Sequence, residues 1–156
     1  ILIINSMLKN LFSTYIFILS PIFAFALAQG LKVFLRSLKR KVTWRDIFAY
    51  SDMPSGHTSV VVAIATIVAF IHGLASTHFA IAFVFATIVI VDAIGLRNYL
   101  GQHGKTINVL VKDLDEDDYL DHDYPKQFEK IGHTPLQVII GAIIGFGTSL
   151  IMYLLF

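Results

Sequence analysis

Four long apolar runs divide this sequence and restrict what it can fold into. They lie within residues 11–31, 55–73, 77–97 and 135–156. A helix needs about 20 predominantly apolar residues to cross the hydrocarbon core of a bilayer, and each run is close to that length. Hydrophobic residues make up 56% of the chain, above the roughly 45–50% of soluble domains. We therefore predict an all-α integral membrane bundle of about four transmembrane helices, forming one domain over residues 1–156.

The remaining polar sequence is concentrated in one long segment, residues 98–132, which we predict to be a polar loop. Its acidic residues between 113 and 123 lack the glycine and the final glutamate of a calcium-binding loop. This composition favours a solvated loop over a cation site. The net charge of +1 does not indicate nucleic-acid binding, and the absence of cysteine excludes disulfides, thiolate zinc sites and cysteine nucleophiles.

Alternating membrane crossings would bring distant polar residues to the same side of the bilayer. Four spans place Lys32, the segment 55–57, Arg97 and His133 on that side, with polar loops gathered on one face. The same side holds eleven of the twelve Lys and Arg residues, and only Lys9 lies on the other. Positively charged loops are typically cytoplasmic, so we expect this face to be cytoplasmic. A bacterial inner membrane and an organelle membrane fit equally well.

The segment Met53-Pro54-Ser55-Gly56-His57-Thr58-Ser59 opens the second apolar run. Pro54 suits the start of a helix, and a helix N-terminus presents free N–H groups that favour an anion such as phosphate. Gly56 lets a ligand approach the backbone, and His57 can transfer protons near neutral pH. The alternative interpretation is an ordinary helix start with a solvated histidine.

Asp92 is the carboxylate inside an apolar run. An ionised carboxylate is costly within a membrane unless it is paired or faces water. Asp92 is therefore a functional candidate, and an interaction with Arg97 is the structural alternative.

Together these residues resemble the superfamily of type-2 phosphatidic acid phosphatases and vanadium haloperoxidases, and in particular its short, divergent membrane branch. Pro54-Ser55-Gly56-His57 matches the second motif of that superfamily in full. Lys32, followed after six residues by Lys39, keeps the charges of the first motif without its Arg-Pro. The segments 92–97 and 132–138 resemble the arginine and histidine parts of a split third motif, and the resemblance covers about residues 29–145.

Two features depart from the superfamily pattern. Gln137 stands four residues after His133, where an acidic residue is expected. An amide can orient an imidazole but carries no charge to stabilise its cation, so full activity is in question, although Asp92 could take the place of the acid. His103 also follows Arg97 at the spacing of the wider superfamily, but Ile107 then occupies the acidic position. We favour His133 as the nucleophile and keep His103 as the alternative.

The resemblance implies hydrolysis of a phosphate monoester through a phosphohistidine, without a metal or other cofactor. His133 would be the nucleophile and His57 the proton donor, with Gln137 and Asp92 as supporting catalytic residues. The phosphate oxygens would be held by Lys32, Lys39, Ser55, Gly56 and Arg97. The expected substrate is a phospholipid in the bilayer: phosphatidylglycerol phosphate first, then phosphatidic acid or an isoprenyl diphosphate.

Other interpretations remain open at this point. A non-catalytic phosphate- or lipid-binding membrane protein with the same fold would also explain Gln137. Gly141 and Gly145, with Gly147 after them, give the last span a small-residue face for close helix packing. Four helices with such a face are compatible with a homodimer.

Overall fold

The computed structural model describes residues 2–38, 41, 53–117, 119, 122 and 124–156. These residues form helices and no strands, as predicted. The helices of the described part are α1 (Leu2–Ser37), α2 (Gly56–His72), α3 (Thr77–Ile94), α4 (Leu96–Glu116) and α5 (Pro135–Leu155).

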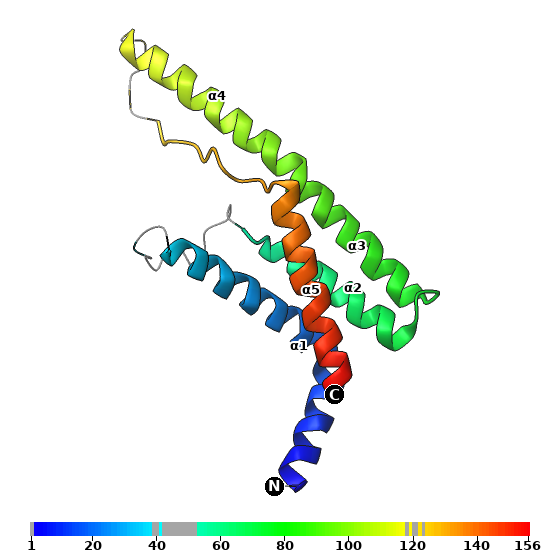
Figure 1. Ribbon diagram of the computed structural model, residues 1–156. Coiled ribbons are helices and arrows are strands. Elements are labelled where there is room, and N and C mark those ends of the chain that lie inside the picture. The colour runs from blue at the N-terminus through cyan, green and yellow to red at the C-terminus, as the bar shows by residue number, and fades with distance from the viewer. Residues whose placement is uncertain (1, 39–40, 42–52, 118, 120–121, 123) are drawn as a thin grey trace.

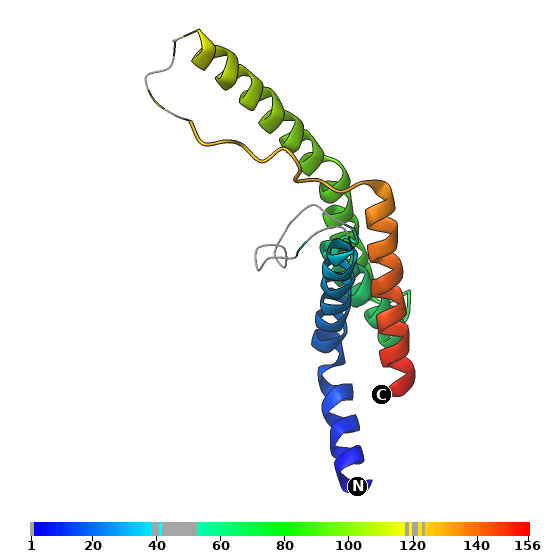
Figure 2. The same cartoon turned by 60° about the vertical axis from the view of Figure 1, so that its left-hand side comes forward.

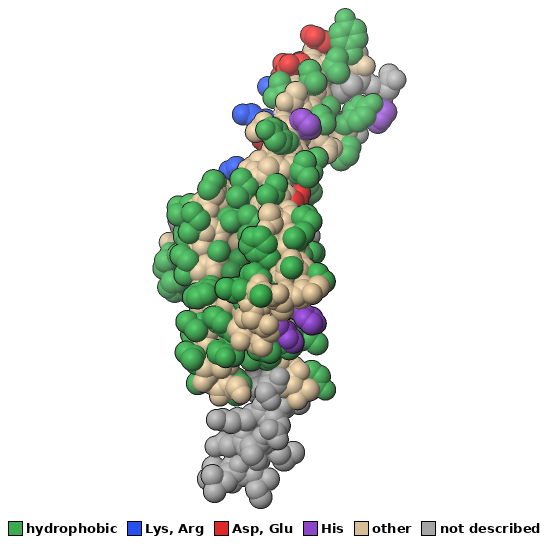
Figure 3. Space-filling view, turned by 90° about the vertical axis from the view of Figure 1, so that its right-hand side faces the viewer, with side chains coloured by type: hydrophobic (Ala, Val, Ile, Leu, Met, Phe, Trp, Pro, Cys, Tyr) green, Lys and Arg blue, Asp and Glu red, His purple; other side chains and the backbone are tan. Residues whose placement is uncertain are grey.

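The helices have the lengths and composition of a membrane bundle. The stretches Thr14–Ser37, Thr77–Glu116 and Pro135–Leu155 are long and apolar enough to cross a membrane, and α2 is a shorter apolar helix of 17 residues. Hydrophobic side chains cover the body of the molecule on the face shown in Figure 3, and charged side chains appear only toward the end that carries α4. The prediction of an integral membrane bundle is confirmed.

Helix α2 lies at the centre of this bundle, where it packs against α1, α3 and α5 (Figure 1). A buried hydroxyl chain joins three of these helices. Ser149 on α5 donates to the carbonyl of Ala63 on α2 at 2.8 Å. Because the only hydroxyl proton of Ser149 is used in this bond, Ser20 on α1 must be the donor to the Ser149 oxygen, at 2.6 Å. Such hydrogen bonds and small side chains hold membrane helices together, because lipid tails provide no hydrophobic drive for helix association.

The small-residue face of α5 packs directly on the backbone of α2. A Cβ added at Gly141 would meet the carbonyl oxygen of Ser55, and one added at Gly145 would meet that of Ser59. Gly147 has nothing within 4 Å of such a Cβ. The predicted close packing is therefore found at Gly141 and Gly145, while Gly147 is outside it.

We expect Gly145→Val to lower the thermal unfolding temperature of the purified protein strongly, because the new side chain would push α5 away from α2. Overpacking a tight contact typically costs about 1–3 kcal/mol. Gly147→Val adds the same side chain to the same helix in open space and is the matched control. Equal unfolding temperatures for the two variants would contradict this account of the α2–α5 contact.

The predicted polar loop over residues 98–132 is wrong in its first half. Residues 98–116 belong to helix α4, and the third predicted span is divided at Gly95 between α3 and α4. Polar content suggested a loop, but apolar side chains recur every three or four residues along this segment, which is the period of a helix. The residues Asp113, Asp115 and Glu116 therefore lie on the last turns of α4, where they are exposed.

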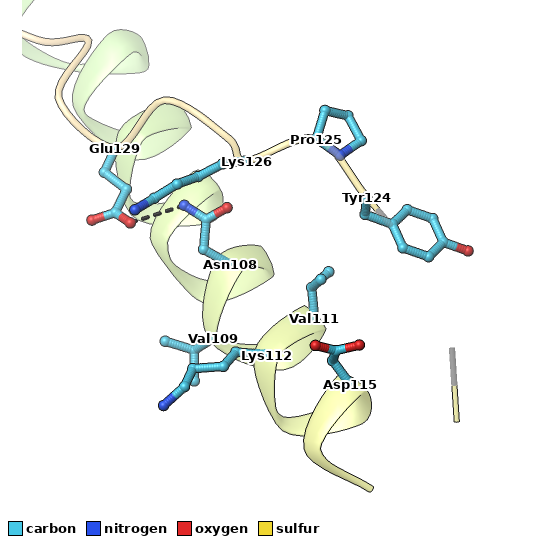
Figure 4. Close-up of a pocket in the computed structure, with 9 residues that line it drawn as sticks. All are labelled: Asn108, Val109, Val111, Lys112, Asp115, Tyr124, Pro125, Lys126 and Glu129. Carbon is cyan, nitrogen blue, oxygen red and sulfur yellow. Dashed lines mark hydrogen bonds between the residues drawn. The ribbon is translucent and has the colours of Figure 1, made fainter. Parts of the chain in front are cut away.

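After α4 the chain returns as an extended segment, residues 124–131, which runs beside α4 in both views (Figures 1 and 2). A Cβ at Gly101 or Gly104 would lie 2.5 Å from a carbonyl oxygen of this segment, so both positions require glycine. Asn108 accepts from the Gln127 N–H at 2.8 Å. Its side-chain amide donates to the Glu129 carboxylate at 2.8 Å (Figure 4). This segment leads the chain back to the start of α5.

Candidate active site

The ends of three helices are joined by backbone hydrogen bonds at the polar end of the bundle. The N–H of Ser55, before α2, donates to the carbonyl of Gln137 in the first turn of α5 at 3.0 Å. The N–H of His133, just before α5, donates to the carbonyl of Ala93 near the end of α3 at 3.0 Å. Residues that are far apart in the sequence therefore meet at one place, as the alternating crossings predicted.

The Pro-Ser-Gly-His segment forms the start of α2, as predicted. Ser55 is the N-cap, and its side-chain oxygen accepts from the N–H of Thr58 at 3.4 Å and from the Thr58 hydroxyl at 2.9 Å. Ser55 is completely buried, so this hydroxyl has a structural role. A Cβ at Gly56 would lie 3.1 Å from the ring of Phe25, which is a tight contact. His57 follows on the exposed side of the first turn.

His133 is buried, with 1% of its surface exposed, and Gln137 determines its tautomer. The Oε1 atom of Gln137 accepts from the Thr134 N–H at 2.9 Å, and this identifies it as the carbonyl oxygen of the amide. The same atom lies 3.2 Å from Nδ1 of His133. A carbonyl oxygen only accepts, so Nδ1 carries the proton and Nε2 carries the lone pair. The amide thus orients a neutral imidazole whose unprotonated nitrogen is Nε2.

The surroundings of His133 favour this neutral form. Burial lowers the pKa of His133 below its ordinary value, and the positive charges of Lys32, His57 and Arg97 lower the pKa further. The hydrogen bond with Gln137 acts in the opposite direction but is outweighed. A lowered pKa means that the ring stays unprotonated at neutral pH and can act as a nucleophile.

The two histidines of the predicted site face each other across a short gap. The ring centroids of His57 and His133 are 6.4 Å apart, and the ring planes are inclined by 55°. Lys32, which is 3% exposed, and Arg97 act electrostatically on both rings. The site therefore combines two imidazoles from different elements with two fixed cations, an arrangement suited to binding a small anion.

Asp92 contacts Arg97 and not His133. Its Oδ2 atom accepts from Nε of Arg97 at 2.7 Å, and both side chains are about one-third exposed, at 32% and 30%. The interaction between Asp92 and Arg97, which was the alternative to a catalytic role for Asp92, is therefore present. Gln137, not Asp92, is the residue beside Nδ1 of His133, and the negative charge of Asp92 acts on His57.

Two other predicted candidates lie away from this cluster or outside the described part. Lys39 lies outside the described residues. His103 is exposed on α4, on a helix and not in the loop that we predicted. Among the described residues, no group of three or more His, Asp or Glu side chains is arranged to hold a metal ion. A cavity of about 450 Å³ between α4 and residues 124–129 contains none of the predicted site residues (Figure 4).

Asn98, which no pattern in the sequence singled out, positions the loop that carries His133. Its side-chain amide donates to the carbonyl of His133 at 3.2 Å and to the carbonyl of Ile94 at 2.6 Å. A Cβ at Gly132 would collide with the same side chain. The only signal in the sequence was the position of Asn98 directly after Arg97.

The bundle and its site define a member of a known family. Residues 13–148 match the model of the Divergent PAP2 family, and the chain belongs to that family. It is 34% identical over 145 residues to the Uncharacterized membrane protein YuiD of Bacillus subtilis (strain 168), an alignment that covers 86% of this chain and 92% of the relative. No solved structure matches the chain significantly.

Proposed function

We propose that the chain is a membrane lipid phosphatase that hydrolyses a phosphate monoester through a phosphohistidine intermediate. The observation that carries this proposal is the 6.4 Å separation of the His57 and His133 rings beside two cations. Reacting atoms approach to about 3–3.5 Å before a bond forms. Two imidazoles this close together can both contact one phosphoryl group, so one ring can attack phosphorus while the other reaches the leaving oxygen.

In the first step Nε2 of His133 attacks phosphorus, and the bond between phosphorus and the alcohol oxygen breaks. His57 gives its proton to that oxygen, so the product leaves as a neutral alcohol. In the second step His57 takes a proton from a water that attacks the phosphohistidine. The phosphorus–nitrogen bond then breaks, which releases inorganic phosphate and restores both imidazoles.

The chain supplies its own charge stabilisation for this reaction. Negative charge on the non-bridging oxygens is held by Lys32 and by Arg97, whose planar guanidinium can bind two oxygens at once. The Gly56 N–H at the start of α2 adds a neutral donor. Asp92 contacts Nε of Arg97 and so leaves the two terminal nitrogens of the guanidinium to face the phosphate.

A groove beneath the site supports a substrate with a lipid tail. It has a volume of about 380 Å³ and runs between α2, α3 and α5. Its lining includes Val62 and Ile90, close in sequence to His57 and Asp92, and extends to Leu74 beyond the far end of α2. The ten steps of helix from Val62 to the end of α2 at His72 span about 15 Å, which is the thickness of one hydrocarbon leaflet. An acyl chain in this groove would hold its phosphate at the level of the two histidines.

The expected side of the membrane guides the choice of headgroup. The distribution of Lys and Arg predicts the cytoplasmic side. Phosphatidylglycerol phosphate is the first choice because it is a monoester made on that face, and phosphatidic acid and isoprenyl diphosphates come next.

Phosphate release from the protein reconstituted in vesicles tests this function. We expect release from the lipid monoesters with and without a chelator, since the proposed chemistry uses no metal ion. A long-chain substrate should react at least about tenfold faster than glycerol phosphate at the same bulk concentration, because its tails confine the phosphate to the site. Release from glycerol phosphate alone would contradict a lipid substrate, and loss of all release with chelator would contradict the metal-independent chemistry.

We expect Gln137→Glu to move the acid limb of the pH profile of kcat/KM to higher pH. A carboxylate beside Nδ1–H favours the imidazolium and so raises the pKa of His133. The neutral nucleophile is then lost at a higher pH as the solution is acidified. Gln137→Met, which removes the hydrogen bond without adding charge, is the control and should not move the limb upward. An unchanged limb in Gln137→Glu would argue that another group controls it.

A non-catalytic phosphate- or lipid-binding protein is the second candidate, and Gln137 in place of an acid favours it. Such a protein would bind vanadate or phosphate at the same cations but release none from any lipid. Absence of turnover that Gln137→Glu does not restore would support this alternative over the phosphatase.

A further inference from the structure

Helix α4 leaves the bundle with an apolar face that the rest of the described chain does not cover. It continues the direction of α3 beyond the ends of the other helices (Figures 1 and 2). Its exposed apolar residues retain between 42% and 65% of their surface. The members of this face, which we call the α4 stripe, are Leu96, Leu100, Ile107, Leu110 and Leu114, with His103 between them.

The spacing of the α4 stripe is that of a coiled coil. Successive members, His103 included, are separated by four, three, four, three and four residues. This alternation is the heptad pattern, with Leu100, Ile107 and Leu114 at a positions and Leu96, His103 and Leu110 at d positions. Ile107 at a and Leu110 at d are the residue types preferred in two-stranded coiled coils, while Leu100 and Leu114 place leucine at the other two a positions.

The extended segment of the chain does not occupy this stripe. It packs against Gly101, Gly104 and Asn108. These positions lie on a flank of the helix, between about 80° and 140° around the axis from Leu96, whereas the stripe is centred near Leu96 itself. One flank of α4 is therefore already covered, and the stripe beside it is left for another partner.

We propose that α4 pairs with α4 of a second copy of this chain, as a parallel two-stranded coiled coil that projects from the membrane. Copies inserted in the same orientation are related by a two-fold axis along the bilayer normal. Helix α4 continues a membrane-spanning helix, so its two copies run in the same direction along that axis. Identical residues then face each other, which is the arrangement that an in-register heptad pattern requires.

The coiled coil is short, and membrane anchoring compensates for its length. The stripe covers residues 96–114, just under three heptads, whereas free coiled coils are usually recognised over at least about three to four. Two copies held in one bilayer have a high effective concentration, so fewer contacts are needed for association. His103 at a d position places a polar residue in the seam, which fixes the register at a cost in stability.

A bilayer surface is a poorer partner for the same stripe. The direction of α4 takes its C-terminal half away from the apolar body of the molecule (Figures 1 and 2). The exposed acidic residues Asp113, Asp115 and Glu116 at that end would be repelled by the anionic lipids of a cytoplasmic leaflet.

Cysteine cross-linking in native membranes tests the pairing directly, because the chain has no cysteine of its own. Under mild oxidation we expect Ile107→Cys and Leu110→Cys to form disulfide-linked dimers. Lys105→Cys and Lys112→Cys stand at f positions on the opposite side of α4 and are the matched controls. They should link at least about tenfold more slowly, because a disulfide needs Cα atoms within about 7 Å.

A second pair of variants tests the seam by loss and gain. Leu110→Asp should abolish cross-linking through Ile107→Cys, and His103→Leu should increase the dimer fraction of the detergent-purified protein by apolar burial at the seam. Equal cross-linking at seam and control positions would overturn the proposal. So would linkage only between Leu96→Cys and Leu114→Cys chains, which would indicate antiparallel pairing. Quenching of a probe at Leu110→Cys by brominated lipids, without cross-linking, would assign the stripe to the membrane.

Discussion

Replacement of His133 by alanine is expected to abolish phosphate release, with a loss of about 10⁴-fold or more, since removal of a nucleophile leaves only binding and charge stabilisation. The side chain is buried, its Nδ1 proton is directed to Gln137, and its Nε2 lone pair is free for attack. His57→Ala should also reduce release to background. The measurement is phosphate released from vesicles that contain the lipid substrate.

Two other histidines serve as controls for this experiment. His78 lies in the first turn of α3, at the opposite end of the bundle from the site, where it stacks on His72 at 4.5 Å between ring centroids. His78→Ala should keep full activity. His103→Ala tests the alternative nucleophile, and it too should keep activity, because His103 is exposed on α4. An active His133→Ala together with an inactive His103→Ala would transfer the nucleophile role to His103.

The second large effect is expected from Arg97. Arg97→Met should lower kcat by about 10²–10³-fold, which is typical for loss of one fixed donor to transition-state charge. Arg97→Lys should restore little of this loss, because a lysine ammonium cannot bind two oxygens in the plane of a guanidinium. The measurement is kcat and KM in vesicles, and retention of wild-type kcat in Arg97→Met would contradict the role.

A double-mutant cycle separates the two possible roles of Asp92. If Asp92 acts by orienting Arg97 through its 2.7 Å contact, Asp92→Asn reduces activity in the wild-type background but has no further effect on Arg97→Met. If the charge of Asp92 acts on His57 instead, the two losses multiply. The structure favours the first result, because Asp92 accepts a hydrogen bond from Arg97.

The sequence predicted which polar residues lie at the same end of the bundle, because this depends only on the number and length of the apolar runs. Apolar runs of spanning length reverse the direction of the chain at the connections between them, and three reversals put Lys32, His57, Arg97 and His133 at one end. The start of α2 was predictable for a similar reason, because Pro54 and Ser55 are strong local signals for a helix N-terminus. The contact of Asp92 required the structure, since Arg97 and His133 were both plausible partners.

Helix α4 was not predicted, because average polarity outweighed periodicity. Residues 98–116 contain charged side chains at a density typical of loops, and the spacing of Leu100, Ile107 and Leu114 carries the helical signal. Asn98 was missed because its role is to bond two carbonyls, those of Ile94 and His133. Nothing in a sequence shows which carbonyls lie within reach of an amide.

Gly141 and Gly145 contact the backbone of α2 directly. This contact makes the geometry of the site independent of the side chains that face the lipid. The two histidines each lie within a turn of helix ends that are joined main chain to main chain, so their spacing does not depend on the large side chains that face the bilayer. Substitutions among those outer side chains, or a thicker bilayer, should therefore leave the spacing of the two histidines unchanged. The close helix contact that the two glycines permit therefore preserves the geometry of the site when the lipid-facing surface changes.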